Sequence, residues 1–178
     1  MRLVFRHAAM SDPGRIRTTN EDRWVAEPAL GLYMVIDGMG GHLAGEIAAD
    51  IVAKTVPSQI RERLFNAAET LDDAAVEQVQ KLIRELSDAL LEQTRGEVGL
   101  EGLGATVVLL LVRDDKALVA HLGDSRAYLL RKNELTRLTS DHTIVQMLVD
   151  RGEIQPEEIV DHPYPLMNPH HAIAVRRR

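Results

Sequence analysis

The sequence contains no cysteine among its 178 residues. The chain therefore cannot form disulfides, zinc–thiolate sites or a cysteine nucleophile. A chain without cysteine is compatible with a reducing compartment, and we expect a cytoplasmic protein.

Long hydrophobic runs and excess positive charge are also missing. The longest apolar run, at residues 105–112, is well short of the roughly 18 residues that indicate a membrane-spanning helix. The first residues, MRLVFRHAAMSDPG, lack the apolar stretch of a signal peptide. The formal net charge of −6 argues against nucleic-acid binding, which needs clustered positive charge. We therefore expect neither a membrane nor a nucleic-acid partner.

The first half of the chain mixes strand-like and helix-like patterns. We expect a strand over residues 3–12 and a pair of strands on either side of Pro28 and Ala29. Residues 42–64 present one apolar helical face, and Pro57 is expected to kink or divide this helix.

The clearest helical pattern covers residues 71–95. Asp72 and Asp73 suit its N-terminal end, where negative charge is favoured. A glycine-rich loop, residues 96–104, is expected to follow it. Apolar residues recur along it at helical spacing: Val76, Val79, Ile83, Leu86 and Leu90.

The second half begins with consecutive strand patterns joined by short turns. The expected strands are 105–113, 116–124, 125–132 and 134–139. Such an order is typical of an antiparallel meander. Short helices are expected at 144–154 and 156–160. Together these patterns predict a single α+β domain over residues 1–178, with helices layered on antiparallel sheet.

The stretch VIDGMGGHLAGE, residues 35–46, places a carboxylate at the end of an apolar strand. Glycines 38, 40 and 41 follow Asp37 closely. A nucleotide phosphate loop is disfavoured, because the Lys-Ser/Thr pair and the required glycine spacing are both missing. Asp37 would also repel phosphate unless a cation lay between them. A tight turn and a cation site both stay open as interpretations.

Other acidic residues also stand where strands begin or end. They are Glu21, Asp22 and Asp124. Hard cations such as Mg²⁺ and Mn²⁺ prefer oxygen ligands of this kind. Arg17 lies on the same polar loop as Asp22, and its planar fork could hold a phosphate. Taken singly, each acidic residue is better explained as a turn residue, and Arg17 as a solvated surface arginine.

Five stretches in a set order carry a resemblance to a known family. They are GRIRTTNED, VIDGMGGHLAGEIAA, GLGATVVLLLV, the long stretch from ALVAHLGDSRAYLL to LVDRGEI, and a following HP. From about residue 7 to residue 163 the chain resembles the bacterial PPM family, the type 2C metal-dependent protein serine/threonine phosphatases. The resemblance implies a sandwich of two antiparallel β-sheets flanked by helices. It also implies hydrolysis of phosphoserine and phosphothreonine by a water activated between two Mg²⁺ or Mn²⁺ ions.

The resemblance also implies roles for individual residues. Asp37 matches the carboxylate that bridges both metals, and Gly38 matches the glycine whose carbonyl binds one of them. Glu21 and Asp22 match the acidic pair that supports the metals through waters and hydrogen bonds. Asp124 matches the aspartate of a third, weaker metal position.

The remaining matches concern the substrate. Arg17 matches the arginine that holds the substrate phosphate, and residues 139–163 match the mobile flap beside the substrate groove. Met39 stands where eukaryotic members often have a histidine proposed as general acid. His42 is a nearby alternative, but a role in capping or packing the following helix is favoured for it.

The stretch after residue 163 departs from the family. Members continue through further strands that bring two more metal-binding aspartates, and residues 164–178 supply neither. We therefore expect an atypical tail with a solvated RRR end, and a sandwich without its last strands. Unfinished sheet edges favour self-association. Replacement ligation by His162, His170 and His171 is disfavoured, because histidine suits softer metals.

Two hypotheses follow. The first is a protein serine/threonine phosphatase, with weak or absent activity for these 178 residues alone. The second is a non-catalytic, phosphatase-like module that binds or regulates a partner. In either case the expected partner is a phosphorylated protein, with a serine/threonine kinase or its targets implied by the resemblance.

Overall fold

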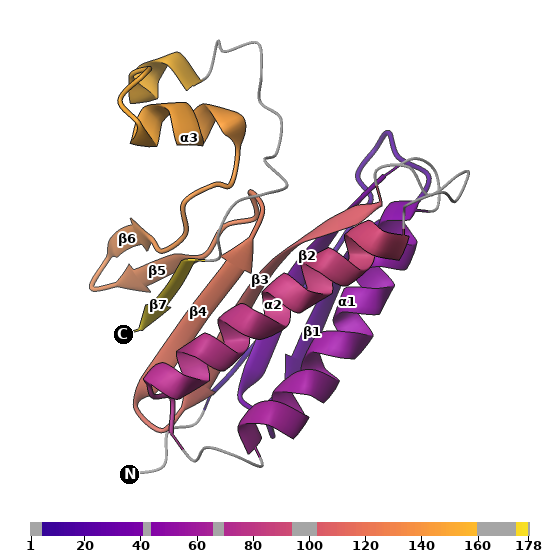
Figure 1. Cartoon of the computed structure of the whole chain (residues 1–178), viewed down its shortest axis with the longest axis vertical. Helices are drawn as coiled ribbons and strands as arrows, with labels where there is room; N and C mark the ends of the chain where they lie inside the picture. The colour runs from indigo at the N-terminus through magenta and orange to yellow at the C-terminus, as the bar shows by residue number, and fades with distance from the viewer. Residues whose placement is uncertain (1–4, 41–43, 66–69, 94–102, 160–173, 178) are drawn as a thin grey trace.

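Antiparallel strands form the main sheet of the protein (Figure 1). The structure, a computed structural model, describes residues 5–40, 44–65, 70–93, 103–159 and 174–177. The strand order in the main sheet is β1-β2-β3-β4-β7. Their bounds are β1 (Asp22–Glu27), β2 (Leu32–Met39), β3 (Gly104–Arg113), β4 (Lys116–Leu122) and β7 (Ala174–Arg177).

Two long helices lie against one side of this sheet, as Figure 1 shows. Helix α1 (Ala44–Ile60) continues into a π-helical turn, η1 (Arg61–Phe65), and α2 (Asp73–Gln93) follows. The Asp72 side chain accepts a hydrogen bond from the Ala75 amide at 3.0 Å, which satisfies a free N–H at the start of α2. Pro57 does not divide α1, so that part of the expectation was wrong.

Successive residues of each strand point to opposite sides of the sheet. On β2, Leu32, Met34 and Ile36 are buried in the core together with residues of α1 and α2. We call this side the helix face. Tyr33 and Val35 point to the other side, which we call the groove face, and each keeps exposed surface.

A second, two-stranded sheet follows β4. It pairs β5 (Tyr128–Arg131) with β6 (Glu134–Arg137). Lys132 and Asn133 both have positive φ, 51° and 64°, as a tight two-residue hairpin turn requires. The expected meander therefore ends at β4, because the chain leaves the main sheet there.

Two short helical segments follow the β5–β6 hairpin. Helix α3 (Ile144–Asp150) begins after Thr143, whose hydroxyl accepts a hydrogen bond from the Gln146 amide at 3.1 Å. A 3₁₀ turn, η2 (Pro156–Ile159), follows. Both agree with the expected positions, although α3 ends earlier than residue 154.

The structure contradicts one expectation at the start of the chain and adds an unexpected strand near its end. Residues 5–12 contain no strand, although a strand was expected over 3–12. Residues 174–177 pair with β4 as strand β7, a strand that the sequence patterns did not predict, and the solvated RRR end stays a prediction. Ala174 pairs with His121 and Arg177 with Leu118, so backbone hydrogen bonding defines this segment. The loop at 96–102 and the three histidines of the tail lie outside the described residues.

Within the described part of the chain, no helix combines the length and apolar character needed to cross a bilayer.

Candidate metal centre

Asp22 and Asp37 stand opposite each other where β1 begins and β2 nears its end. They are Cα partners in the antiparallel register, and both lie on the groove face. Directly opposed like charges destabilise a strand pair. Two carboxylates in this position therefore form a site that a bound cation would stabilise.

The electrostatics of Asp37 support this interpretation. Partial burial of its carboxylate raises its pKa above the ordinary aspartate value, and the charges of Asp22 and Asp124 raise the pKa further. The positive charge of Arg17 acts in the opposite direction. Asp22, Asp124 and Arg17 thus all lie within electrostatic range of the Asp37 carboxylate.

Glu21 and Gly38 are held in place by close packing of backbone. The Gly38 amide donates a hydrogen bond to the Glu21 carbonyl at 3.2 Å. A Cβ on Gly38 would come within 2.0 Å of the Gly45 carbonyl oxygen in α1. Gly38 therefore lets the start of α1 approach the strand. The suggested role of its own carbonyl as a metal ligand stays a prediction.

A cleft of about 220 Å³ opens beside the two aspartates. Ser11 donates a long hydrogen bond, 3.4 Å, to the Asp22 carboxylate and accepts one from the Asn20 side chain at 2.7 Å. The residues that line this cleft include Met10, Ser11, Asp22, Trp24, Asp37 and Ser125.

Two hydroxyl groups near Asp37 were missed by the sequence reasoning. Thr106 is the β3 partner of Asp37 in the register. Its Oγ1 lies 2.6 Å from Oγ of Ser125, which lines the cleft. Ser125 directly follows Asp124 in the GDSR stretch, and this neighbour relationship was the available signal.

The residues present fit a hard cation in their chemistry. Side-chain carboxylates, hydroxyls and backbone carbonyls supply oxygen atoms, which Mg²⁺ and Mn²⁺ prefer. Within the ranges that the structure describes, no three histidine, aspartate or glutamate side chains converge on one point. A cation at this site would therefore need water or further oxygen ligands in addition to Asp22 and Asp37.

The turn that carries Asp124 is tied to the beginning of the expected flap. The Gly123 amide donates to Nδ1 of His142 at 3.2 Å, and the His142 amide donates to the Gly123 carbonyl at 3.0 Å. The His142 ring stacks on His121 with a centroid distance of 4.3 Å. Both rings are buried. Sequence reasoning did not single out this histidine pair.

An arginine–aspartate cluster strengthens the same connection. Arg126 donates to both carboxylate oxygens of Asp141, with the shortest contact at 2.6 Å, and Arg137 also contacts that carboxylate. Such bidentate contacts are the stronger kind of ion pair. The cluster joins the β5–β6 hairpin to the segment that leads into α3.

The structure describes only one of the two residues considered for the proton-donor position. Met39 ends β2, paired with Gly104, and its thioether cannot donate a proton. His42 lies outside the described residues, so its suggested role stays a prediction.

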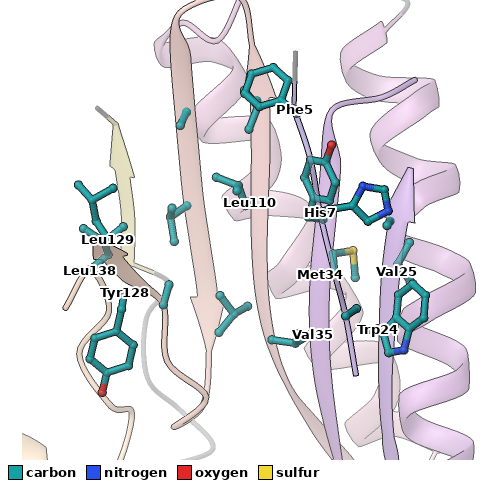
Figure 2. A pocket seen from close by; sticks show the side chains of 18 of the residues that line it. Phe5, His7, Trp24, Val25, Met34, Val35, Leu110, Tyr128, Leu129 and Leu138 are labelled. Atoms are coloured by element: carbon teal, nitrogen blue, oxygen red, sulfur yellow. The ribbon is translucent and has the colours of Figure 1, made fainter. Parts of the chain in front are cut away.

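The rest of the groove face is apolar. A groove of about 920 Å³ lies between the main sheet and the β5–β6 hairpin. In Figure 2 the side chains of Trp24, Val35 and Leu110 project from the sheet on the side away from the helices, while Tyr128 and Leu129 lie across from them. Phe5 and His7 of the N-terminal segment also line it.

Fold and site together define a class. The chain is an α+β protein whose antiparallel sheet ends in an oxygen-donor site suited to hard cations, with an arginine close by. Comparison with known proteins gives the family. Residues 17–153 match the family model of protein phosphatase 2C. The chain belongs to this family, in agreement with the resemblance that its motifs carry.

Curated relatives are bacterial serine/threonine phosphatases. The chain is 41% identical over 161 residues to the serine/threonine protein phosphatase PstP of Mycobacterium tuberculosis. It is 33% identical over 157 residues to the serine/threonine phosphatase stp of Listeria monocytogenes. These matches cover 90% and 86% of this chain but only 30% and 61% of the two relatives.

Solved structures of the family share the fold. The crystal structure of PstP matches with a TM-score of 0.77 at 36% identity, covering 97% of this chain and 72% of that one. A structure of the PstP catalytic domain in complex with two manganese ions matches with a TM-score of 0.75 at 35% identity, covering 97% and 71%. The expected α+β architecture with antiparallel sheets is thus confirmed.

Proposed function

We propose that the chain takes part in metal-dependent hydrolysis of phosphoserine and phosphothreonine in proteins. The observation that carries this proposal is the opposition of Asp22 and Asp37, with the raised pKa of Asp37 beside Asp124 and Arg17. Family membership and the serine/threonine phosphatases among its relatives support the same chemistry.

We propose Mn²⁺ or Mg²⁺ as the cofactor, two ions in a complete site and a third at a weaker position. Asp37 would bridge two ions, the Gly38 carbonyl would bind one of them, and Glu21 and Asp22 would support them. Asp124 would serve the third position. Bound ions of this kind supply an activated water and neutralise charge on a transferred phosphoryl group.

Arg17 is proposed to hold the substrate phosphate. It lies on an exposed loop near Asp37, and its charge reaches that carboxylate. A planar guanidinium can bind two phosphate oxygens at once. Arg17 would therefore orient the phosphate over the cation site and offset its charge.

The proposed surroundings of the site follow from the same family membership. We propose a single phosphatase domain over residues 1–178, with the flap at 139–163 beside the substrate and residues 164–178 as an atypical segment. The partner would be a phosphorylated protein, either a serine/threonine kinase or one of its targets, in the cytoplasm. Cell fractionation followed by immunodetection would test the location.

Self-association is also proposed, with a second copy of this chain contacting the unfinished sheet edges and the apolar groove face beside them. Soluble monomers rarely expose large contiguous apolar patches. Trp24 and Val35 are 47% and 49% exposed on this face, and β1 is the outer strand of the main sheet.

Hydrolysis of a phosphothreonine peptide at increasing Mn²⁺ concentration tests the proposed activity. Activity should depend on Mn²⁺ and fall at least about a hundredfold in Asp37→Asn, because a carboxylate that binds the cation is lost. Arg17→Ala should raise KM about tenfold or more, since charge-assisted contacts to phosphate are lost. Arg15→Ala, two residues away on the same exposed loop, is the matched control and should leave KM unchanged.

The same assay separates the two functional hypotheses. Mn²⁺-dependent turnover that survives Asp37→Asn would contradict the assigned site. Absence of turnover in the unaltered chain, together with Arg17-dependent binding of the phosphopeptide, would favour the non-catalytic module.

A further inference from the structure

Arg23 connects the acidic end of β1 to helix α1. Its Nε donates to Oδ1 of Asp50 at 2.6 Å, and its Nη2 donates to Oε1 of Glu46 at 2.9 Å. Both acceptors belong to α1. The Arg23 side chain is 27% exposed, so it is more sheltered than an ordinary surface arginine.

The third nitrogen of the same guanidinium holds the backbone of the acidic segment. Nη1 of Arg23 donates to the carbonyl of Asn20 at 3.0 Å and to that of Asp22 at 2.8 Å. One rigid planar group thus makes four hydrogen bonds, two to the helix and two to the residues around Glu21. A lysine could not reproduce this arrangement, because its ammonium is a compact point donor.

The acidic end of β1 needs such a support. Asp22 and Asp37 form the terminal pair of the β1–β2 ladder, and β1 is the outer strand of the sheet. Strand ends open most easily, and two opposed carboxylates favour opening further. An anchor on the acidic segment would therefore oppose opening of this strand end when no cation is bound.

We propose that Arg23 is a positioning residue that holds the acidic end of β1 against β2, so that Asp22 and Asp37 are preorganised for a cation. It acts through the backbone of residues 20–22. The identity of the cation rests on the proposed function, but the positioning of the strand end does not.

Nothing in the sequence singles out Arg23, because Arg23 is an isolated basic residue that directly follows the acidic pair Glu21 and Asp22. Its partners are 23 and 27 positions away in the chain. The strand alternation also places Arg23 on the helix face, opposite to the side on which Asp22 lies. The residue can therefore support the site without occupying it.

Amide hydrogen exchange in EDTA tests the positioning directly. The Gly38 amide donates to the Glu21 carbonyl and so reports whether the strand end stays closed. In Arg23→Ala this amide should exchange at least about tenfold faster, because charge-assisted hydrogen bonds are lost. The Val112 amide, which donates to the Gly31 carbonyl at the other end of the sheet, should be unaffected.

A matched control removes an ion pair from the opposite end of the same strand. Arg61 contacts Glu27, the last residue of β1, at 2.6 Å. Arg61→Ala should leave exchange at Gly38 unchanged. Arg23→Lys should give an intermediate rate, and it also serves as the test variant if the alanine variant does not fold.

Calorimetric titration with Mn²⁺ then tests the link to the cation. Residues that orient metal ligands typically contribute 10–100-fold to affinity. Arg23→Ala should weaken Mn²⁺ binding by about that factor, whereas Arg61→Ala should not.

Unchanged exchange at Gly38 in the Arg23 variants would overturn the proposal, whatever the metal data. Faster exchange with unaltered Mn²⁺ affinity would overturn the link between Arg23 and the cation. If the unaltered chain binds no Mn²⁺, the cation site of the proposed function fails, and exchange at Gly38 alone decides the role of Arg23.

Discussion

The two faces of the main sheet are built from alternate residues of the same strands, yet they differ in packing and charge. On the helix face, Leu32 and Leu109 are fully buried beneath α1 and α2. On the groove face, Val35 is half exposed and Asp37 faces a cleft. The helix face supplies most of the buried hydrophobic core, whereas the groove face leaves apolar side chains exposed and places the opposed carboxylates at one end. Because successive side chains of a strand point to opposite faces, one strand can contribute to the core and to the candidate site at the same time.

Neighbouring leucines on β3 provide the largest expected contrast between the faces. Leu109 is fully buried on the helix face, whereas Leu110 lines the groove. Leu109→Ala should lower the free energy of unfolding by about 2–5 kcal/mol, because a buried cavity is left. Leu110→Ala should cost about 1 kcal/mol. Urea denaturation measures both, and equal losses would mean that the groove face is packed as tightly as the helix face.

Self-association through the groove face should respond to a smaller change. Val35→Lys places a charge among exposed apolar side chains and should weaken a groove-face dimer about tenfold or more. Ile47, 41% exposed on α1, gives the matched control Ile47→Lys, which should have no effect. Analytical ultracentrifugation over a range of concentrations measures the equilibrium. A monomer at all concentrations would refute the proposed dimer, and equal effects of both variants would refute its location.

The smallest effect concerns the charge of Asp37. Because its pKa is raised in the folded chain, the folded state holds this proton more tightly than the unfolded state does. Stability is therefore lost as pH rises from the ordinary aspartate pKa of about 4 through the raised value. Asp37→Asn removes this loss, and at pH 7 in EDTA it should raise Tm by roughly 1–2 °C.

Thermal scans at pH 4 and pH 7 measure that difference. Asp88→Asn, on the exposed side of α2, is the control and should not reproduce it. A lower Tm for Asp37→Asn at pH 7 would mean that the carboxylate stabilises the fold by contacts stronger than the repulsion.

Local patterns were sufficient for most of the elements. The apolar spacing of Val79, Ile83 and Leu86 correctly indicated α2, and the alternation around Pro28 correctly indicated the β1–β2 hairpin. Pairing between distant segments was beyond such reasoning. Strand β7 joins β4 across more than 50 positions of sequence, and no periodicity in the tail signals this.

The residues of the candidate site likewise fall into those that local motifs indicated and those that depend on distant partners. Motif resemblance brought Asp22, Asp37 and Asp124 forward, and in the structure the charges of Asp22 and Asp124 act on the Asp37 carboxylate. Arg23 and the stacked pair His121 and His142 stayed hidden, because their roles depend on partners that only the folded chain brings close. Support of a site through packing leaves little trace in local sequence.

The register of β2 has one more consequence. If this strand paired one residue out of step, Asp37 would turn beneath the helices and Ile36 would take its place on the groove face. Such a mispaired chain would bury a charge and would present no pair of carboxylates. Pairing of β2 in the observed register is therefore what places both carboxylates on one face of the sheet.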